Sequence, residues 1–168
     1  MKRDADMLAK SPLAADLSPE ELRQLLAAGS FSRFKAGETI MREGEESDTM
    51  YLFLEGTADV TKNLTLKTAG RGFGHAEKSM TRLKAASAPV FGEMSLLGDA
   101  PRSATVSAVT DCLLFALGHD AYEALCASNP RLGLALTRKV AAILSSRVRK
   151  GNEDVLKLST ALSIALSR

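Results

Sequence analysis

The residues best suited to chemistry lie in segment 91–106, which reads FGEMSLLGDAPRSATV. Gly92 lets the backbone approach a ligand more closely than a residue with a side chain would. Glu93 to Leu97 can form one helical turn, and the first N–H groups of such a turn have no partner inside the helix. Arg102 adds a planar cation suited to two phosphate oxygens. This combination predicts an anion site.

Glu93 refines that prediction. Its carboxylate would repel a phosphate group but can accept a hydrogen bond from a sugar hydroxyl. A carboxylate beside a phosphate site is therefore expected if the ligand is a nucleotide. In the purely structural alternative, Glu93 and Arg102 pair with each other at the edge of a jelly roll.

The segment resembles the phosphate-binding cassette of the cyclic nucleotide-binding domain family. That family includes the regulatory subunits of cyclic-AMP-dependent protein kinase, the bacterial catabolite activator protein and cyclic-nucleotide-gated channels. Its pattern joins F-G-E-hydrophobic-[AS]-L-hydrophobic to P-R-[AST]-A-[ST]-hydrophobic, and this chain has both halves in the same order. The matching residues are Phe91, Gly92, Glu93, Ser95, Leu96, Pro101, Arg102, Ser103, Ala104, Thr105 and Val106.

The resemblance implies a site for a 3′,5′-cyclic nucleotide. Arg102 would pair with the exocyclic phosphate oxygens, and Glu93 would accept from the ribose 2′-hydroxyl. Leu83 and Val90 would pack against the base or, equally, belong to the barrel core. Counting along the expected C-terminal helix places Arg147 near the base, as a cap or as a solvent-facing charge. The backbone N–H groups expected to complete the site belong to Gly92, Met94, Ser95, Ser103 and Ala104.

Ser103 does not choose between ligands, because cyclic AMP binders and cyclic GMP binders of this family both carry serine after the arginine. We expect cyclic AMP, with cyclic GMP as the alternative, and no cofactor. Binding would shift the C-terminal helices, with Leu96 and Leu97 as the contact between cassette and helix. The competing functions are a ligand-free scaffold or interaction protein and a sensor of another nucleotide, such as a cyclic dinucleotide.

Glycine spacing and apolar periodicity predict the elements that position the cassette. A helix with a capping box begins at Ser18, and Gly29 is expected to end it. Short strands separated by glycine turns follow. The resemblance, which covers roughly residues 17–149, implies an α+β fold with an eight-stranded antiparallel β jelly roll flanked by an N-terminal helix and C-terminal helices. The expected parts of this one domain are a helical segment at 1–30, the jelly roll at 31–118 and the C-terminal helices at 119–168.

Two helices are expected after the jelly roll. The first spans Asp120–Ala127, and the second runs from Asn129-Pro130 to about Lys150, where Gly151-Asn152 is expected to break it. A further amphipathic stretch is expected to be intramolecular core or the seam of a homodimer through the C-terminal helices. Its apolar residues are Val155, Leu158, Leu162 and Ala165.

Residues 62–84 depart from the family, which usually has a short hairpin here. Six of them are Lys or Arg, against one acid, Glu77, and Gly70, Gly72 and Gly74 predict a flexible tip. The expectation is a solvated, mobile hairpin. The alternatives are a basic arm for an acidic partner or nucleic acid, and an extra phosphate site for a cyclic dinucleotide.

Composition narrows the remaining function classes. A chain of 168 residues with 45% hydrophobic and 25% charged residues and a net charge of +2 indicates an ordinary globular domain without a strong nucleic-acid signal. No apolar run approaches the roughly 20 residues of a membrane span. The N-terminus lacks a secretory signal, so a cytoplasmic location is expected.

Catalysis and DNA binding are not expected either. No nucleophile–base pair appears, and His75 and His119 are not at metal-ligand spacing. Cys112 and Cys126 resemble small buried hydrophobes. The residues after Gly151 are too few for a winged helix-turn-helix, unless the chain is a fragment. The sequence therefore predicts a non-enzymatic regulator that signals to an unidentified protein partner.

Overall fold

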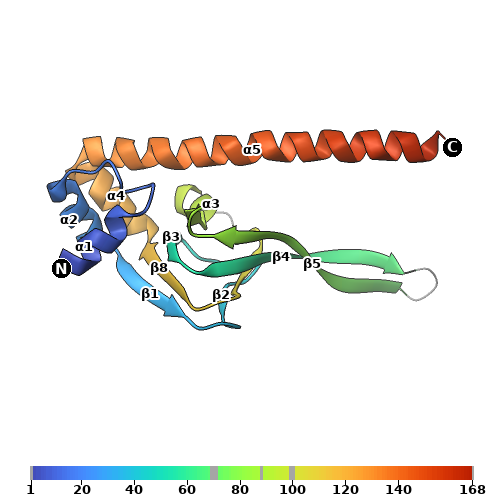
Figure 1. Ribbon diagram of the computed structural model, residues 1–168, viewed down its shortest axis with the longest axis horizontal. Coiled ribbons are helices and arrows are strands. Elements are labelled where there is room, and N and C mark those ends of the chain that lie inside the picture. Colours follow the sequence, from blue (N-terminus) through green and yellow to red (C-terminus); the bar gives the residue numbers. More distant parts are fainter. Residues whose placement is uncertain (1, 69–71, 88, 99–100, 168) are drawn as a thin grey trace.

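The computed structural model describes residues 2–68, 72–87, 89–98 and 101–167 (Figure 1). Within these ranges, two four-stranded sheets have the strand orders β1-β8-β3-β6 and β2-β7-β4-β5. Every strand pair is antiparallel, which confirms the predicted jelly roll. The strands are β1 (Ser30–Phe34), β2 (Thr39–Met41), β3 (Met50–Glu55), β4 (Thr57–Thr68), β5 (Gly72–Lys84), β6 (Val90–Phe91), β7 (Thr105–Ala108) and β8 (Cys112–Leu117).

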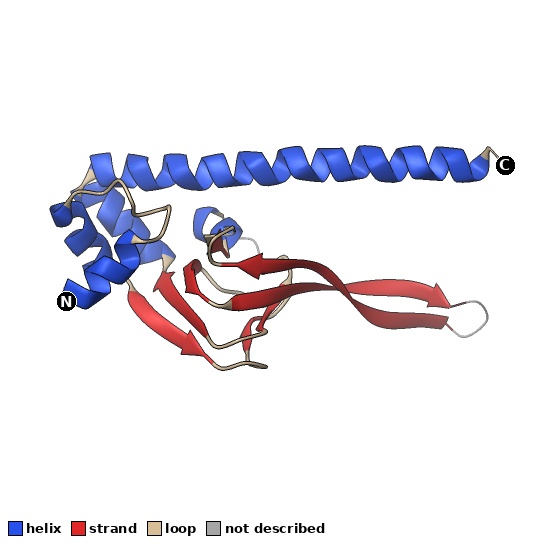
Figure 2. Cartoon of the chain, viewed as in Figure 1, coloured by secondary structure: helices blue, strands red, loops and turns tan. Residues whose placement is uncertain are grey.

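Helices flank the jelly roll, as predicted. Those that precede and follow it gather at one end of the sheets, and the last one runs along the length of the molecule (Figure 2). A search of the described residues finds no helix that is both long enough and apolar enough to span a membrane. The helices are α1 (Lys2–Ala9), α2 (Pro19–Ala28), α3 (Glu93–Leu97), α4 (His119–Ser128) and α5 (Pro130–Leu166).

Helix α2 begins where the capping box predicts. The Ser18 hydroxyl accepts from the Glu21 N–H at 3.3 Å, and the Glu21 carboxylate accepts from the Ser18 N–H at 2.8 Å. Two of the donors that a helix start leaves open are thereby satisfied. The helix ends before Gly29, where a Cβ would come within 2.4 Å of the Ala116 carbonyl oxygen. A glycine is required at this exit because strand β8 packs directly against it.

The described residues form two hydrophobic cores. One lies between the sheets and includes Phe53, Phe91 and Leu114. The other lies between the first sheet and the helices and includes Met50, Val90, Leu96, Phe115 and Leu136. Neighbouring residues of a strand point to opposite faces, so Val90 and Phe91 enter different cores although they adjoin in β6.

Both cysteines are free thiols that contribute to packing, as predicted. Cys112 is buried in the core between the sheets, and burial raises the pKa of its thiol. Cys126 packs at the edge of the helix-side core. A Cβ on Gly133 of α5 would come within 2.7 Å of the Cys126 sulfur, so this glycine lets α4 and α5 approach closely.

Helix α5 is continuous over 37 residues, so the predicted break at Gly151-Asn152 is wrong. A glycine inside a helix costs only about 1 kcal/mol relative to alanine, and neighbouring helix formers can compensate for that cost. The predicted start is confirmed. The Asn129 side chain accepts from the Leu132 N–H at 3.1 Å, and Pro130 occupies the first helical turn.

Strands β4 and β5 form a long hairpin that extends past the barrel (Figure 1). Gly72 and Gly74 pair with Thr68 and Leu66 in this ladder, so they belong to strand β5 and not to the turn at the tip. The two strands satisfy each other's backbone hydrogen bonds, which keeps these glycines in register. The third glycine of that prediction, Gly70, lies outside the described residues.

Candidate functional site

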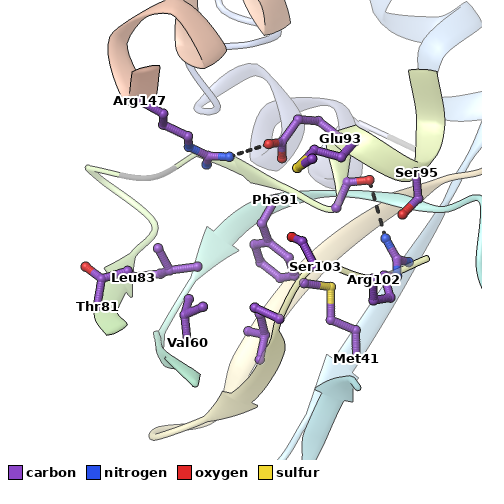
Figure 3. A pocket seen from close by; sticks show the side chains of 14 residues that line it. Met41, Val60, Thr81, Leu83, Phe91, Glu93, Ser95, Arg102, Ser103 and Arg147 are labelled. Atoms are coloured by element: carbon purple, nitrogen blue, oxygen red, sulfur yellow. Dashed lines mark hydrogen bonds and ion pairs between the residues drawn. The ribbon is translucent and has the colours of Figure 1, made fainter. Parts of the chain in front are cut away.

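A pocket of about 210 Å³ lies where the cassette and α5 meet the strands (Figure 3). Apolar side chains from β2, β4, β5, β6 and β7 form one part of it, and polar groups from the cassette and α5 form the other. Its lining consists of Met41, Val60, Thr81, Leu83, Phe91, Gly92, Glu93, Met94, Ser95, Arg102, Ser103, Ala104, Val106 and Arg147.

The structure brings all but one of the predicted site residues into this lining. They come from four places: β5, the α3 turn, the loop before β7, and α5. Val90 is the exception. Its side chain is fully buried in the helix-side core, because the alternation along β6 turns Phe91 toward the pocket instead.

Five lining residues were absent from the predicted site: Met41, Val60, Thr81, Phe91 and Val106. Val60 of β4 pairs with Thr81 on one side and Val106 on the other, so these three residues share one sheet face. Strand alternation offers a sequence signal for such residues, but only the register shows which of them are neighbours.

Arg102 is the most unusual group in the pocket. Its side chain is only 3% exposed. Nη2 donates to the Ser47 hydroxyl at 2.8 Å and Nη1 to the Gly92 carbonyl at 3.3 Å, while Nε has no partner among the described residues. The guanidinium carbon also lies 5.8 Å from the centre of the Tyr51 ring. Burial lowers the pKa of Arg102 from its ordinary value.

This arginine has no carboxylate partner at ion-pair distance within the described part of the chain. Taking a cation out of water is unfavourable unless a counter-charge accompanies it. The arrangement is therefore expected where an anionic ligand supplies that charge. The structural alternative, a pair between Glu93 and Arg102, does not occur, because Glu93 pairs with Arg147.

Gly92 makes the position of Arg102 possible. Its φ is +76°, in the left-handed region, and it precedes the first residue of α3. A Cβ at this position would come within 2.6 Å of Arg102 Nη1 and 2.8 Å of the Thr49 carbonyl oxygen. No side chain caps the N–H groups at the start of α3. Gly92 and Glu93 line the pocket together with Arg102.

Arg147 is an ion-pair partner that stays partly exposed to solvent. Its Nη1 lies 2.6 Å from Oε1 of Glu93, and its Nη2 donates to the carbonyl of Val90. The Glu93 side chain is 6% exposed and that of Arg147 is 39% exposed. The pair therefore ties α5 to both the cassette and β6, as Figure 3 shows for Glu93.

Two larger grooves lie elsewhere, one of about 610 Å³ beside β3 and one of about 650 Å³ between α1 and α2. The described residues that line them include no buried charged side chain like Arg102. The described residues also include no group of three His, Cys, Asp or Glu side chains able to hold a metal ion. Within the described ranges, Arg102 is the buried cation that lines a pocket.

Comparison with known proteins agrees with this geometry. Residues 31–129 match the model of the cyclic nucleotide-binding domain. The chain is 35% identical over 118 residues to a cAMP-dependent protein kinase regulatory subunit of Aspergillus niger, covering 70% of this chain and 26% of that protein. It is 31% identical over 145 residues to a cyclic nucleotide-gated potassium channel of Mesorhizobium japonicum, covering 83% and 36%. This chain therefore corresponds to only part of each relative.

Solved structures give the same result. The catabolite activator protein of Thermus thermophilus is similar with a TM-score of 0.71 and 30% identity, covering 89% of this chain and 63% of that one. A cyclic nucleotide-binding domain from Methylobacillus flagellatus is similar with a TM-score of 0.72 and 25% identity, covering 92% and 82%. With the cassette, the jelly roll and these similarities taken together, the chain belongs to the cyclic nucleotide-binding domain family.

Proposed function

We propose that this protein is a non-enzymatic receptor for a 3′,5′-cyclic nucleotide, with cyclic AMP as the ligand and cyclic GMP as the alternative. Binding would change the position of its C-terminal helices and so signal to a protein partner. The observation that carries the proposal is the buried Arg102, whose Nε lacks a partner within the described ranges and which lies beside the start of α3, where no side chain caps the helix. One cyclic phosphate would supply the missing negative charge.

The rest of the pocket fits the other two parts of a nucleotide. Glu93 is the first residue of α3, whose N–H groups no side chain caps. Its carboxylate lines the pocket and could accept a hydrogen bond from a ribose hydroxyl. The apolar side chains of Val60, Leu83 and Val106 would pack against the base. Relatives named for cyclic AMP and for cyclic nucleotide gating support this ligand class.

Entry of the ligand would require α5 to move. The pocket of about 210 Å³ is smaller than the roughly 300 Å³ at which ligand pockets usually begin. Arg147 lines the pocket and holds the carboxylate that the ribose would use. The ligand would thus favour a different arrangement of Glu93 and α5 from the one described, which is the differential binding that a population shift needs.

The two competing functions receive less support. In a scaffold without a ligand, a buried cation that has no counter-charge within the described residues would be an uncompensated cost. A cyclic dinucleotide needs a second phosphate site, yet the described lining holds only Arg102 and Arg147 as cations, and Arg147 is paired with Glu93. In the basic hairpin, Arg82 is held by Asp59 of the neighbouring strand at 2.6 and 2.8 Å.

Isothermal titration of nucleotide-free protein tests the proposal. Cyclic AMP, cyclic GMP, 5′-AMP and a cyclic dinucleotide are titrated in turn, and the recovered ligands are analysed for products. We expect a cyclic mononucleotide to bind most tightly and to be recovered unchanged. Absence of binding by both cyclic mononucleotides would overturn the receptor proposal. Tighter binding of the dinucleotide would replace the proposed ligand, and turnover would contradict a non-enzymatic role.

A further inference from the structure

The loop that joins β2 to β3, residues 42–49, is tied to the backbone of Arg102. The Gly44 N–H donates to the Arg102 carbonyl at 2.9 Å, and the Arg102 N–H donates to the Glu45 carbonyl at 3.0 Å. These two hydrogen bonds fix the β2–β3 loop to the residue that carries the buried guanidinium. The loop reads REGEESDT, and its acidic residues are Glu43, Glu45, Glu46 and Asp48.

The side chain of this acidic loop that contacts the guanidinium is an uncharged one. Arg102 Nη2 donates to the Ser47 hydroxyl at 2.8 Å, whereas no described carboxylate of the loop lies at ion-pair distance from Arg102. Burial lowers the pKa of Arg102, and the more distant charges of Glu45 and Asp48 oppose this effect only in part. The hydroxyl of Ser47 therefore satisfies one donor of the guanidinium without neutralising its charge.

Ser47 does not belong to the described lining of the pocket, so its effect on a ligand must pass through Arg102. The other terminal nitrogen of Arg102, Nη1, donates to the Gly92 carbonyl at 3.3 Å (Figure 3). Two neutral acceptors thus hold the two terminal nitrogens, while Nε has no partner among the described residues. The guanidinium is fixed in position and its charge is left unpaired.

A carboxylate in place of this hydroxyl would have opposite effects on the free protein and on an anionic ligand. A hydroxyl oxygen accepts an N–H but carries no net charge. A carboxylate would form a charge-assisted pair with the guanidinium, and such bonds are roughly twice as strong as neutral ones. It would relieve the cost of a buried, unpaired cation. A phosphate would then have to compete with it for the same charge.

We propose that Ser47 is the positioning residue that holds Arg102 for the ligand phosphate while keeping its positive charge available. This inference rests on the proposed receptor function and deepens it, because it assigns the affinity of the phosphate site partly to a residue outside the pocket. A negative charge at position 47 would close the site to a cyclic phosphate from within the chain.

Isothermal titration of Ser47→Asp and Ser47→Asn with cyclic AMP tests the role of charge. The two side chains have the same shape and differ in charge, so each is the control for the other. We expect Ser47→Asp to bind about tenfold more weakly than Ser47→Asn, or weaker still, because the phosphate must compete with the carboxylate. Equal affinities of these two variants would overturn the proposal.

The conservative variants test the role of the hydroxyl. Ser47→Ala removes the acceptor of Nη2 and should bind cyclic AMP several-fold more weakly than the parent protein. Ser47→Thr restores a hydroxyl and should recover most of that loss. If Ser47→Ala bound as tightly as Ser47→Thr, the hydroxyl would not be what positions Arg102.

Urea unfolding of the nucleotide-free protein gives a test that needs no ligand. Ser47→Asp should unfold at a higher urea concentration than Ser47→Asn, because the carboxylate supplies the counter-charge that the buried Arg102 lacks. In the Arg102→Ala background, the two substitutions should give the same midpoint. An advantage of Ser47→Asp that persisted without Arg102 would contradict a direct contact between residues 47 and 102.

The two kinds of measurement separate this inference from the receptor proposal. If the parent protein binds cyclic AMP but the Asp and Asn variants bind equally, only the role of Ser47 falls. If the parent protein binds neither cyclic mononucleotide, the receptor proposal falls. The unfolding series then still decides whether Ser47 leaves the charge of Arg102 unpaired.

Discussion

The guanidinium of Arg147 in α5 lies 2.6 Å from the carboxylate of Glu93, the first residue of α3 in the cassette. This ion pair joins positions 54 residues apart. A change in how the Glu93 carboxylate is held would therefore be passed to α5 through this ion pair.

Arg147→Ala should loosen α5 from the cassette. The largely buried Glu93 would lose its cation, and the half-exposed position of Arg147 limits the expected loss of stability to about 1 kcal/mol. Because Arg147 holds the carboxylate that the ribose would use, we also expect several-fold tighter binding of cyclic AMP, and hydrogen exchange around residue 147 of α5 that no longer responds to the nucleotide. Arg149→Ala is the control, because Arg149 donates to Ser145 of the same helix and has no hydrogen bond or ion pair with the cassette among the described residues. Equal behaviour of the two variants would contradict the role of Arg147.

Arg102→Ala should abolish nucleotide binding and leave the fold intact. A charge-assisted contact with phosphate is worth about 1.5–3 kcal/mol, so the affinity should fall tens-fold or more. The free protein should lose little stability, since a buried cation without a counter-charge is itself unfavourable. Arg102→Lys keeps the charge but not the planar fork and should bind with intermediate affinity.

Arg82→Ala is the control for that series, because Arg82 is an exposed arginine whose partner is Asp59 of the neighbouring strand. Titration calorimetry and thermal unfolding of the three variants separate binding from folding. If Arg102→Ala bound cyclic AMP as tightly as the parent protein, Arg102 would not be the phosphate-binding residue.

The parts of the site that are local in sequence could be predicted from it. Gly92, Glu93 and Arg102 lie within one short segment, and their residue types already specify a close backbone approach, a sugar acceptor and an anion fork. Met41 and Val60 could not be identified in this way. They reach the pocket only through the register of β2 and β4 with β7, which long-range packing sets.

The predicted helix break at Gly151 and the predicted placement of Val90 in the site failed for different physical reasons. Gly151 was expected to end a helix because glycine has a low helix propensity, but that preference is a weak one that context overrides. Val90 was expected in the site because it adjoins the cassette. In a strand, however, a shift of one residue moves a side chain to the opposite face, and Phe91 is the residue that faces the pocket.

His119 should make stability depend on pH. Its Nδ1 lies 2.8 Å from the Leu96 carbonyl oxygen, so the first residue of α4 is joined to the cassette turn. This hydrogen bond raises the pKa of His119 above its ordinary value, with smaller contributions from Glu123, Asp120 and Asp48. A raised folded pKa means that the native state binds the proton more tightly. The stabilisation from protonated His119 is therefore complete below about pH 6.5, the pKa of histidine in the unfolded chain. It is lost as the pH rises through the pKa of His119 in the folded protein.

Urea unfolding at a series of pH values measures this effect. The free energy of unfolding of the parent should fall as the pH rises from about 6.5 through the folded pKa of His119. His119→Gln should show a weaker dependence of this free energy on pH. His75→Gln removes the other histidine of the chain and should keep the parental slope. If the pH dependence persisted in His119→Gln and disappeared in His75→Gln, it would come from His75 and not from the contact between His119 and Leu96.

Gly92→Ala should damage both the fold and the site. A residue with a side chain at φ +76° costs about 1–2 kcal/mol, and the new Cβ would lie 2.6 Å from Arg102 Nη1. The guanidinium must then shift out of the position that faces the phosphate. Gly37→Ala is a matched control, since φ there is +89° but nothing lies within 4 Å of the added carbon. Urea unfolding should show a loss of stability in both variants, whereas titration should show weakened binding in Gly92→Ala alone. If Gly92→Ala bound cyclic AMP as tightly as Gly37→Ala, the backbone at residue 92 would not be what positions Arg102 for the ligand.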